Sequence, residues 1–241
     1  MKEEQLIIAK ILDKIKKYEK TGSFCSTNFL DPLEILETEH LVKKFPSCYF
    51  GGYNNAERKI LFLGSDDENI AKEYIEILTI ECNKNMSHRE VLGSVLGLGL
   101  SRDVIGDIII KENRADIFVT KEISQYIVQN LNKVGKERVN VYKNSYDNLL
   151  VPDNNSKEIK TTVASLRIDA VISVAIGTSR EISAKLIENQ KVKLNYKLIS
   201  NSSKQIKIGD KISVRGYGRI ELIEILGETK KGRIRIVLRK F

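Results

Sequence analysis

The order of apolar and polar positions predicts a helical start to the chain. Six apolar residues recur at the spacing of one helical face: Leu6, Ile7, Ile8, Ile11, Leu12 and Ile15. Charges interrupt this segment every few residues, which is typical of an amphipathic helix and not of a signal peptide. Pro32 follows Asp31 near the first turn of a second predicted helix. We therefore expect an N-terminal helical region over residues 1–55.

The pattern changes to alternating strands and helices between residues 56 and 145. The predicted order is strand, strand, helix, strand, strand, helix and strand, at residues 59–64, 74–80, 87–98, 107–112, 115–120, 121–132 and 138–142. Ser87 and Glu90 have the spacing of a capping box at the start of the first of these helices. This order predicts a split α+β domain of the RNA-recognition or ferredoxin-like kind, with both helices on one face of the sheet.

The last third of the chain predicts a second α+β domain. Residues 146–160 are polar and rich in turn formers, so they are predicted as a linker. Two helices follow, one at residues 166–176 and one that opens with a capping box at residues 178–181. Short strands separated by glycines then predict a small twisted sheet, which completes a domain at residues 161–241.

The positive charge of the chain lies in this last third. The whole sequence has 40 Lys and Arg against 32 Asp and Glu, a net charge of +8. Residues 156–241 contain 19 basic and 8 acidic residues, a net charge of +11, whereas residues 1–155 have a net charge of −3. This asymmetry is typical of a polyanion-binding domain attached to a neutral body, although a solvated basic surface would show it too.

Composition narrows the compartment and the chemistry. No stretch has the ~18–20 consecutive apolar residues of a membrane span. Cys25, Cys48 and Cys82 are odd in number and share no CxxC spacing, which argues against a disulfide framework and favours a reduced, cytoplasmic location. His40 and His88 are isolated, so we expect no metal and no cofactor.

Four separated segments of the last third belong together. They read LRIDAVI, TSREISAKLI, VKLNYK and IGDKISVRGYGR. In this order they resemble the ribosomal protein S-four type RNA-binding domain, over residues 165–218. The resemblance implies that two helices and a hairpin present basic side chains to structured RNA. The residues expected to contact RNA are Arg167, Ser179, Arg180, Lys185, Lys193, Asn195, Tyr196, Lys197 and Arg215.

Neighbouring residues are expected to support this surface. Arg180 falls in the first turn of its helix, where free backbone amides and the helix dipole favour a phosphate. Asp169 is expected to hold the two helices together, and Leu186 and Ile187 are expected in the core. Gln190 replaces a glycine that is usual after the second helix, so Asn189 or Gln190 has to form that helix end. Tyr196 replaces the glycine of the common Val-Asn-Gly hairpin.

The upstream sequence widens the resemblance. GGYNNAERK at residues 51–59 and SHREVLGSVLGLGLSRDVIGDI at residues 87–108 resemble segments of the YlmH-like family of bacterial proteins with a C-terminal S-four type domain. This implies a ribosome-associated, RNA-binding protein of the cytoplasm. Some family members are linked to cell division, and small relatives of the domain act on large subunits that carry stalled peptidyl-tRNA. His88, Arg89 and Arg102 fall in the second segment and are candidates for further RNA or partner contacts, although arginines that pair with Asp103 or Asp107 would be structural.

The leading hypothesis is therefore a non-enzymatic binder of ribosomal RNA, with the large subunit and tRNA as candidate partners, in translation or ribosome quality control. No G-x-S-x-G, Walker or metal motif is present, and GLGLSR lacks the third glycine of a dinucleotide loop. An RNA-modifying enzyme with an unrecognised site and a cell-division adaptor remain alternatives. We expect no DNA partner, and the sequence leaves the oligomeric state open.

Overall fold

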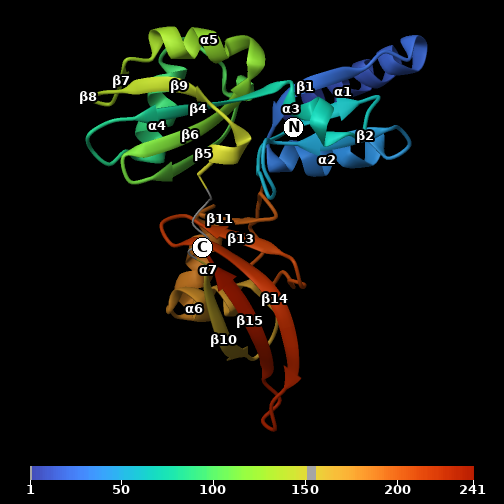
Figure 1. Ribbon diagram of the computed structural model, residues 1–241. Helices are drawn as coiled ribbons and strands as arrows, with labels where there is room; N and C mark the ends of the chain where they lie inside the picture. The colour runs from blue at the N-terminus through green and yellow to red at the C-terminus, as the bar shows by residue number, and fades with distance from the viewer. Residues whose placement is uncertain (1, 151–155) are drawn as a thin grey trace. The chain divides into compact units, whose positions relative to one another are not determined.

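A computed structural model describes residues 2–150 and 156–241, and the chain divides into two compact units at residues 1–153 and 154–241. Each unit has its own buried apolar core. The centre of the predicted linker, residues 151–155, lies outside the described residues. The α+β fold class is confirmed, because antiparallel sheets and helices alternate through both units (Figure 1).

The first unit contains a small N-terminal sheet and a larger central one. Its main elements are α1 (Lys2–Thr21), β1 (Cys25–Leu30), α2 (Pro32–Val42), β2 (Ser47–Phe50), β3 (Lys59–Leu63), α3 (Glu68–Lys72), β4 (Ile75–Glu81), α4 (His88–Leu96), η1 (Arg102–Val104), β5 (Ile105–Lys111), β6 (Arg114–Thr120), α5 (Lys121–Asn130), β7 (Lys133–Val134), β8 (Glu137–Arg138), β9 (Asn140–Asn144) and η2 (Tyr146–Asn148).

The N-terminal sheet corrects two predictions. Residues 1–55 are not wholly helical, since they contain β1 and β2. Moreover, β3 is the middle strand of the order β1-β3-β2 and does not join the central sheet. Ile11 and Ile15 of α1 pack with Leu61 and Leu63 on one face of β3. Every residue of β3 after the first is buried, and such a strand pattern does not reveal which sheet the strand joins.

The central sheet has the antiparallel order β5-β6-β4-β9, and α4 and α5 cover one of its faces as expected. Val95 of α4 and Ile127 of α5 share a core with Leu78 and Ile117 of the strands. The capping box at the start of α4 is present: the Ser87 side chain accepts from the Glu90 amide, and the Glu90 carboxylate accepts from the Ser87 amide. The predicted helix start is therefore confirmed.

The opposite face of the central sheet is also buried. Ile77 and Phe118 on this face are at most 1% exposed, and they pack with Phe29 and Phe62 of the N-terminal sheet. A Cβ added at Gly106 would lie 2.6 Å from the Phe29 ring, so this glycine permits the close approach of the two sheets. The first unit is thus layered as helices, central sheet and N-terminal sheet.

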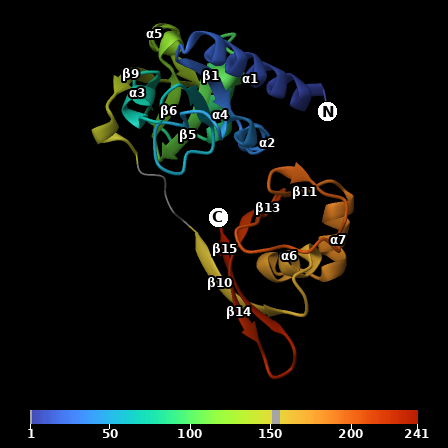
Figure 2. The same cartoon turned by 90° about the vertical axis from the view of Figure 1, so that its right-hand side faces the viewer.

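The second unit places two helices against a six-stranded sheet. Its elements are β10 (Lys157–Val163), α6 (Ile168–Ile176), α7 (Arg180–Glu188), β11 (Val192–Leu194), β12 (Lys197–Leu198), β13 (Lys211–Val214), β14 (Gly218–Glu228) and β15 (Ile234–Lys240). The strand order is β10-β15-β14-β13-β11-β12, with antiparallel pairing throughout. Figure 2 shows both helices on the same side of this sheet.

Two local predictions in this unit need correction. Residues 157–160 are not linker, because they are the first half of β10 and pair with β15. The N-cap of α7 is Ser179 and not Thr178: the Ser179 hydroxyl accepts from the Ile182 amide at 3.2 Å. Thr178 instead donates its amide to Ser173 at the end of α6, so the turn between the helices uses it.

Candidate nucleic-acid interface

The burial of both faces of the central sheet limits where RNA can bind. Domains of the RNA-recognition kind stack bases on an open sheet face that carries aromatic residues. Here Phe118 is fully buried on that face and its ring stacks on Tyr53, with 5.1 Å between ring centroids. Nearby, the buried Asp116 carboxylate accepts from Thr79, Arg114 and the Leu150 amide, which holds the segment after η2 on the sheet. Base stacking is therefore blocked over the middle of this sheet.

In the second unit a buried carboxylate gathers two of the predicted RNA-binding arginines. Asp169, only 4% exposed, accepts from Nε and Nη2 of Arg167 at 3.1 and 3.0 Å and from Nη2 of Arg180 at 2.9 Å. The expected role of Asp169 in joining the helices is confirmed. The side chains of Arg167 and Arg180 remain 34% and 50% exposed. A guanidinium has five N–H groups, so each arginine keeps donors for a ligand.

The charges in this group are fixed by their contacts. Burial alone would raise the pKa of Asp169, but hydrogen bonds from Arg167, Arg180 and the Ala170 amide outweigh it and lower that pKa. The Asp169 carboxylate also raises the pKa of Arg167, chiefly by accepting its hydrogen bonds. The group thus carries two positive charges and one negative charge at neutral pH. It faces solvent beside the N-terminal amides of α7, which favour an anion.

Lys185 lies on the same helix as Arg180 but in a different setting. Its ammonium contacts the Glu181 carboxylate at 2.8 Å, an exposed pair one helical turn apart. Such exposed ion pairs contribute little to the free energy of folding, and the Lys185 ammonium can leave Glu181 for another partner at low cost. Lys185 therefore extends the basic surface along α7, but among the described residues its ion-pair partner is the exposed Glu181 and not a buried carboxylate such as Asp169.

The β11–β12 hairpin has a two-residue turn with an unusual backbone. Asn195 and Tyr196 have φ angles of 47° and 67°, as in a type I′ turn. The side-chain nitrogen of Asn195 donates to the Asp210 carboxylate at 2.8 Å, and its side-chain oxygen accepts from the backbone amide of Lys211 at 2.9 Å. The Asn195 side chain therefore holds the turn against the start of β13. A bulky residue such as Tyr196 rarely adopts positive φ, and strain of this kind clusters at binding sites.

The lysines of the hairpin divide between the two faces of the sheet. Val192 and Leu194 point into the core, so Lys193 between them lies on the face away from the helices. Lys197 pairs across the turn with Leu194 and is exposed. The structure thus brings Arg167 and Arg180 together, but places Lys193 on the opposite side of the sheet.

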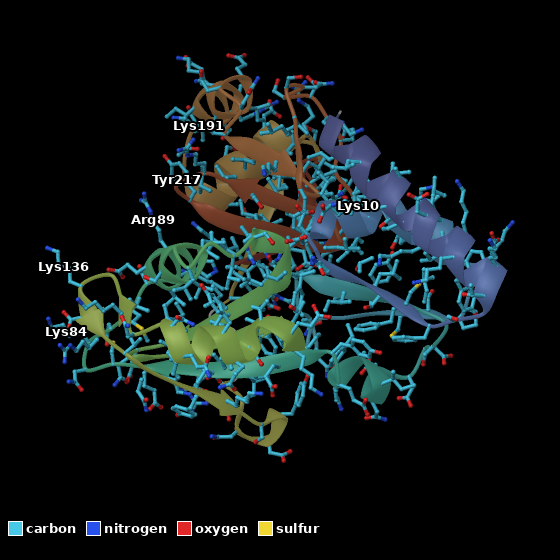
Figure 3. All side chains as sticks on the ribbon, turned by 90° about the horizontal axis from the view of Figure 1, so that it is seen from above. Lys10, Lys84, Arg89, Lys136, Lys191 and Tyr217 are labelled. Atoms are coloured by element: carbon cyan, nitrogen blue, oxygen red, sulfur yellow. The ribbon has the colours of Figure 1, made fainter. Side chains whose placement is uncertain are left out.

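Arg215 belongs to a third group at the end of β13. Its amide donates to the Lys191 carbonyl at 2.9 Å, which ties the β13–β14 turn to the segment after α7. Tyr217 in the same turn is 40% exposed, and the hydrogen bond between Arg215 and Lys191 brings this turn to the segment that carries Lys191; Lys191 and Tyr217 are both labelled in Figure 3. Neither Tyr217 nor Lys191 was among the predicted contacts. Tyr217 stands between glycines 216 and 218, which mark a turn, whereas Lys191 is brought to that turn by its hydrogen bond with Arg215.

Of the three candidates in the first unit (His88, Arg89 and Arg102), Arg102 is held by contacts within the fold. It donates to the carbonyls of Ile105 and Gly106, and burial followed by the nearby charge of Arg58 lowers its pKa to about 10. It does not pair with Asp103 or Asp107. Asp107 instead accepts from the Tyr53 hydroxyl and from the amide of Arg58, which folds the GGYNNAERK segment around this carboxylate.

His88 and Arg89 open α4 and are both exposed. Although the side chain of His88 is exposed, neighbouring atoms partly desolvate its imidazole. This desolvation, and then the charge of Arg102, lower the pKa of His88, so the imidazole is mostly neutral at pH 7. Figure 3 shows Arg89 projecting away from the ribbon. Arg89 is therefore the candidate of the three whose charge is presented to solvent.

Two absences among the described residues concern metal ions and membranes. Within residues 2–150 and 156–241, no group of three or more His, Cys, Asp or Glu side chains could hold a metal ion. In the same part of the chain, no helix is both long and apolar enough to cross a membrane.

Comparisons with known proteins identify the class. Residues 70–148, which contain the central sheet with α4 and α5, match the family model described as "Putative RNA-binding domain in YlmH". The chain is 30% identical to the "Ribosome-associated protein quality control protein P2" of Bacillus subtilis (strain 168), over 99% of this chain and 96% of that protein. It is thus an α+β protein whose central part matches an RNA-binding family.

The particular family follows from the full-length match. The chain belongs to the YlmH family, as its sequence segments indicated. Its fold is also similar to the solved structure of "Cell division protein ylmH from Streptococcus pneumoniae", with a TM-score of 0.56 and 22% identity over 62% of this chain and 95% of that one.

Proposed function

We propose that this protein is a non-enzymatic, cytoplasmic factor that binds structured ribosomal RNA in ribosome quality control. The RNA lies on the large subunit, and a peptidyl-tRNA held there is a second contact. The second unit is proposed to be a domain of the S-four type and to provide the main RNA-binding surface through α6, α7 and the β11–β12 hairpin. DNA is not proposed as a partner.

The observation that carries this proposal is the arrangement of Arg167, Asp169 and Arg180. A buried carboxylate fixes both guanidiniums before any ligand arrives, so less side-chain entropy is lost on binding. Arginine presents paired N–H groups that match the oxygens of a phosphate. The arginines stand in a unit whose described residues carry a net charge of +11, which attracts a polyanion.

The relatives support the ribosomal part of the proposal. The Bacillus subtilis protein is named for ribosome-associated quality control, and it aligns with this chain over nearly its full length. The family model for the central part carries an RNA-binding description. Because the face of the central sheet is filled by Phe118 and its neighbours, we assign the central part a supporting contact through the exposed Arg89.

Co-sedimentation with ribosomes tests this function most directly. The full chain should sediment with large ribosomal subunits through a sucrose gradient at low salt and dissociate as salt rises, since phosphate contacts dominate the affinity. The fragment 154–241, which has its own core, should bind structured RNA alone, and the fragment 1–153 should bind it far more weakly. Equal affinity of the two fragments at one salt concentration would refute the assignment to the second unit.

The same experiment separates the alternatives. A cell-division adaptor for which RNA is incidental would remain at the top of the gradient with or without salt. An RNA-modifying enzyme would sediment with its substrate, but mass spectrometry of the bound RNA would show a mass change after incubation. Binding without a mass change is the result expected here.

A further inference from the structure

The strands β10, β15 and β14 form a blade that extends past the rest of the second unit's sheet. β13 pairs with β14 as far as Glu221, and Leu222 exchanges backbone hydrogen bonds with Gly209 and Asp210 just before β13. From Ile223 to Glu228, β15 is the only described strand that pairs with β14. Six residues of strand span about 20 Å. Figures 1 and 2 show this blade narrowing to the turn that joins β14 to β15.

Charge is segregated along the blade. At its base Arg239 lies directly opposite Glu221 on one side and Glu158 on the other. At the tip, residues 228–235 contain four basic residues and only Glu228 as an acid, a net charge of +3. At the wide end of the blade, Glu221 and Glu158 therefore offset the positive charge of Arg239, whereas the tip keeps its net positive charge.

The turn at the tip is held in one conformation. The Thr229 amide donates to the Arg233 carbonyl at 2.7 Å, and the Thr229 hydroxyl accepts from the Arg233 amide at 3.0 Å. The Arg233 guanidinium reaches across to Thr162 of β10, with distances of 3.0 Å to the hydroxyl and 2.8 Å to the carbonyl. Arg233 is thus used in the fold, and the exposed Lys230 and Lys231 are presented on an ordered support.

This tip lies at the same end of the unit as the arginine group. Val163, the last residue of β10, pairs with Ile234 at the tip end of β15. Arg167 follows four residues later, so its Cα is at most about 14 Å from that of Val163. One RNA element can therefore reach both places.

We propose that Lys230 and Lys231 at the β14–β15 turn form a second phosphate-contacting surface, which binds the same structured RNA as Arg167 and Arg180. This inference rests on the proposed function and assigns it a contact outside the two helices and the β11–β12 hairpin. Lysine ammoniums act as point charges on the RNA backbone, so the contact adds affinity without reading sequence.

A rival account gives these lysines another role. The open edge of β14 could pair with another chain, and lysines near such an edge prevent this. The two accounts differ in what the variant K230A/K231A does. Loss of edge protection would produce larger species on gel filtration with unchanged RNA affinity per folded chain, and that result would overturn the proposal.

The test uses the full chain and a fluorescein-labelled RNA hairpin of roughly 20 base pairs, which is long enough for a shape-specific contact. K230A/K231A should weaken binding ~10-fold near ~0.15 M salt and flatten the slope of log affinity against log salt by about 1.5. K43A/K44A is the matched control, because it removes the same dipeptide at an exposed turn after α2 and should change neither quantity. K230R/K231R should keep the affinity of the parent.

The outcomes distinguish a failure of the Lys230 and Lys231 contact from a failure of the proposed RNA-binding function. If the parent binds and Arg180→Ala weakens binding, but K230A/K231A matches K43A/K44A, only the assignment of Lys230 and Lys231 as RNA contacts is overturned. If the parent binds neither the hairpin nor large ribosomal subunits, the proposed function fails and this inference fails with it.

Discussion

Replacing Arg180 and Ile187 separates RNA contact from scaffold within one helix. Arg180 opens α7 with its side chain half exposed, and Ile187 near the end of α7 is fully buried in the core. Leu186 was also expected in the core, but it is only partly buried, so Ile187 is the better probe. The two variants are Arg180→Ala and Ile187→Ala in the fragment 154–241.

The magnitudes follow from the contacts. Truncating a fully buried isoleucine to alanine costs roughly 2–5 kcal/mol of folding free energy. Without Arg180, the Asp169 carboxylate still accepts from Arg167 and from the Ala170 amide, so the loss is one exposed charge-assisted contact, about 1 kcal/mol. In a domain of this size 1 kcal/mol shifts the Tm by about 4–8 °C.

Melts by circular dichroism and RNA binding by anisotropy read both effects. Arg180→Ala should lose at least ~5-fold in RNA affinity, the contribution of one phosphate contact, with a small drop in Tm. Ile187→Ala should lower the Tm by more than about 10 °C and, at a temperature where it is still folded, bind RNA like the parent. If Arg180→Ala binds like the parent, or melts as early as Ile187→Ala, the arginine group is structural.

Three further outcomes are expected. Gln190 at the end of α7 has a φ of 55°, a left-handed conformation that is strained for glutamine but not for glycine. Gln190→Gly should therefore raise the free energy of unfolding of the second unit by about 0.5–1 kcal/mol in denaturant melts, and a lower free energy of unfolding would refute the presence of strain at this residue. Folding lowers the pKa of Asp169, so the stability that this carboxylate contributes is present above its ordinary pKa of about 4 and is lost as the pH falls through the folded value. Thermal melts from pH 7 to pH 2 should therefore show a steeper loss of stability in acid for the parent than for Asp169→Asn. Parallel curves for the two proteins would refute this. Chelation with EDTA should leave folding and RNA binding unchanged, whereas a loss that a divalent ion reverses would reveal a missed metal site.

Local signals in the sequence predicted much of the second unit. Both ends of α6 and the start of α7 lie within two residues of their predicted positions, because apolar periodicity and capping residues act over a few positions. The substitution at residue 190 correctly indicated an unusual helix end: Gln190 takes the left-handed conformation and donates to Ile187, and Lys191 donates to Leu186. Asp169 was also expected to hold the two helices together, and it pairs with Arg167 before α6 and with Arg180 of α7.

Contacts between segments that are distant in the chain could not be predicted from local patterns. The strand β3 was predicted as a strand but assigned to the wrong sheet, since a fully buried strand pattern is the same in either sheet. The burial of the Phe118 face depends on Phe29, which is about 90 residues away in sequence. The segment 157–160 was predicted as linker because Lys157, Glu158 and Lys160 are all polar and exposed, so the first half of β10 lacks the apolar alternation of a half-buried strand.

The sequence by itself determined the fold class, the family, the charge asymmetry and the identity of the arginines at the helix starts, because each of these depends on composition or on residues close in the chain. The tertiary structure decided which of the basic residues lie together. It joined Arg167 to Arg180 through one buried carboxylate, placed Lys193 on the other side of the sheet, and brought the β14–β15 turn to the end of the unit where Arg167 lies. Hydrogen-bond register and core packing between distant segments fix these positions, and neither has a local signature in the sequence.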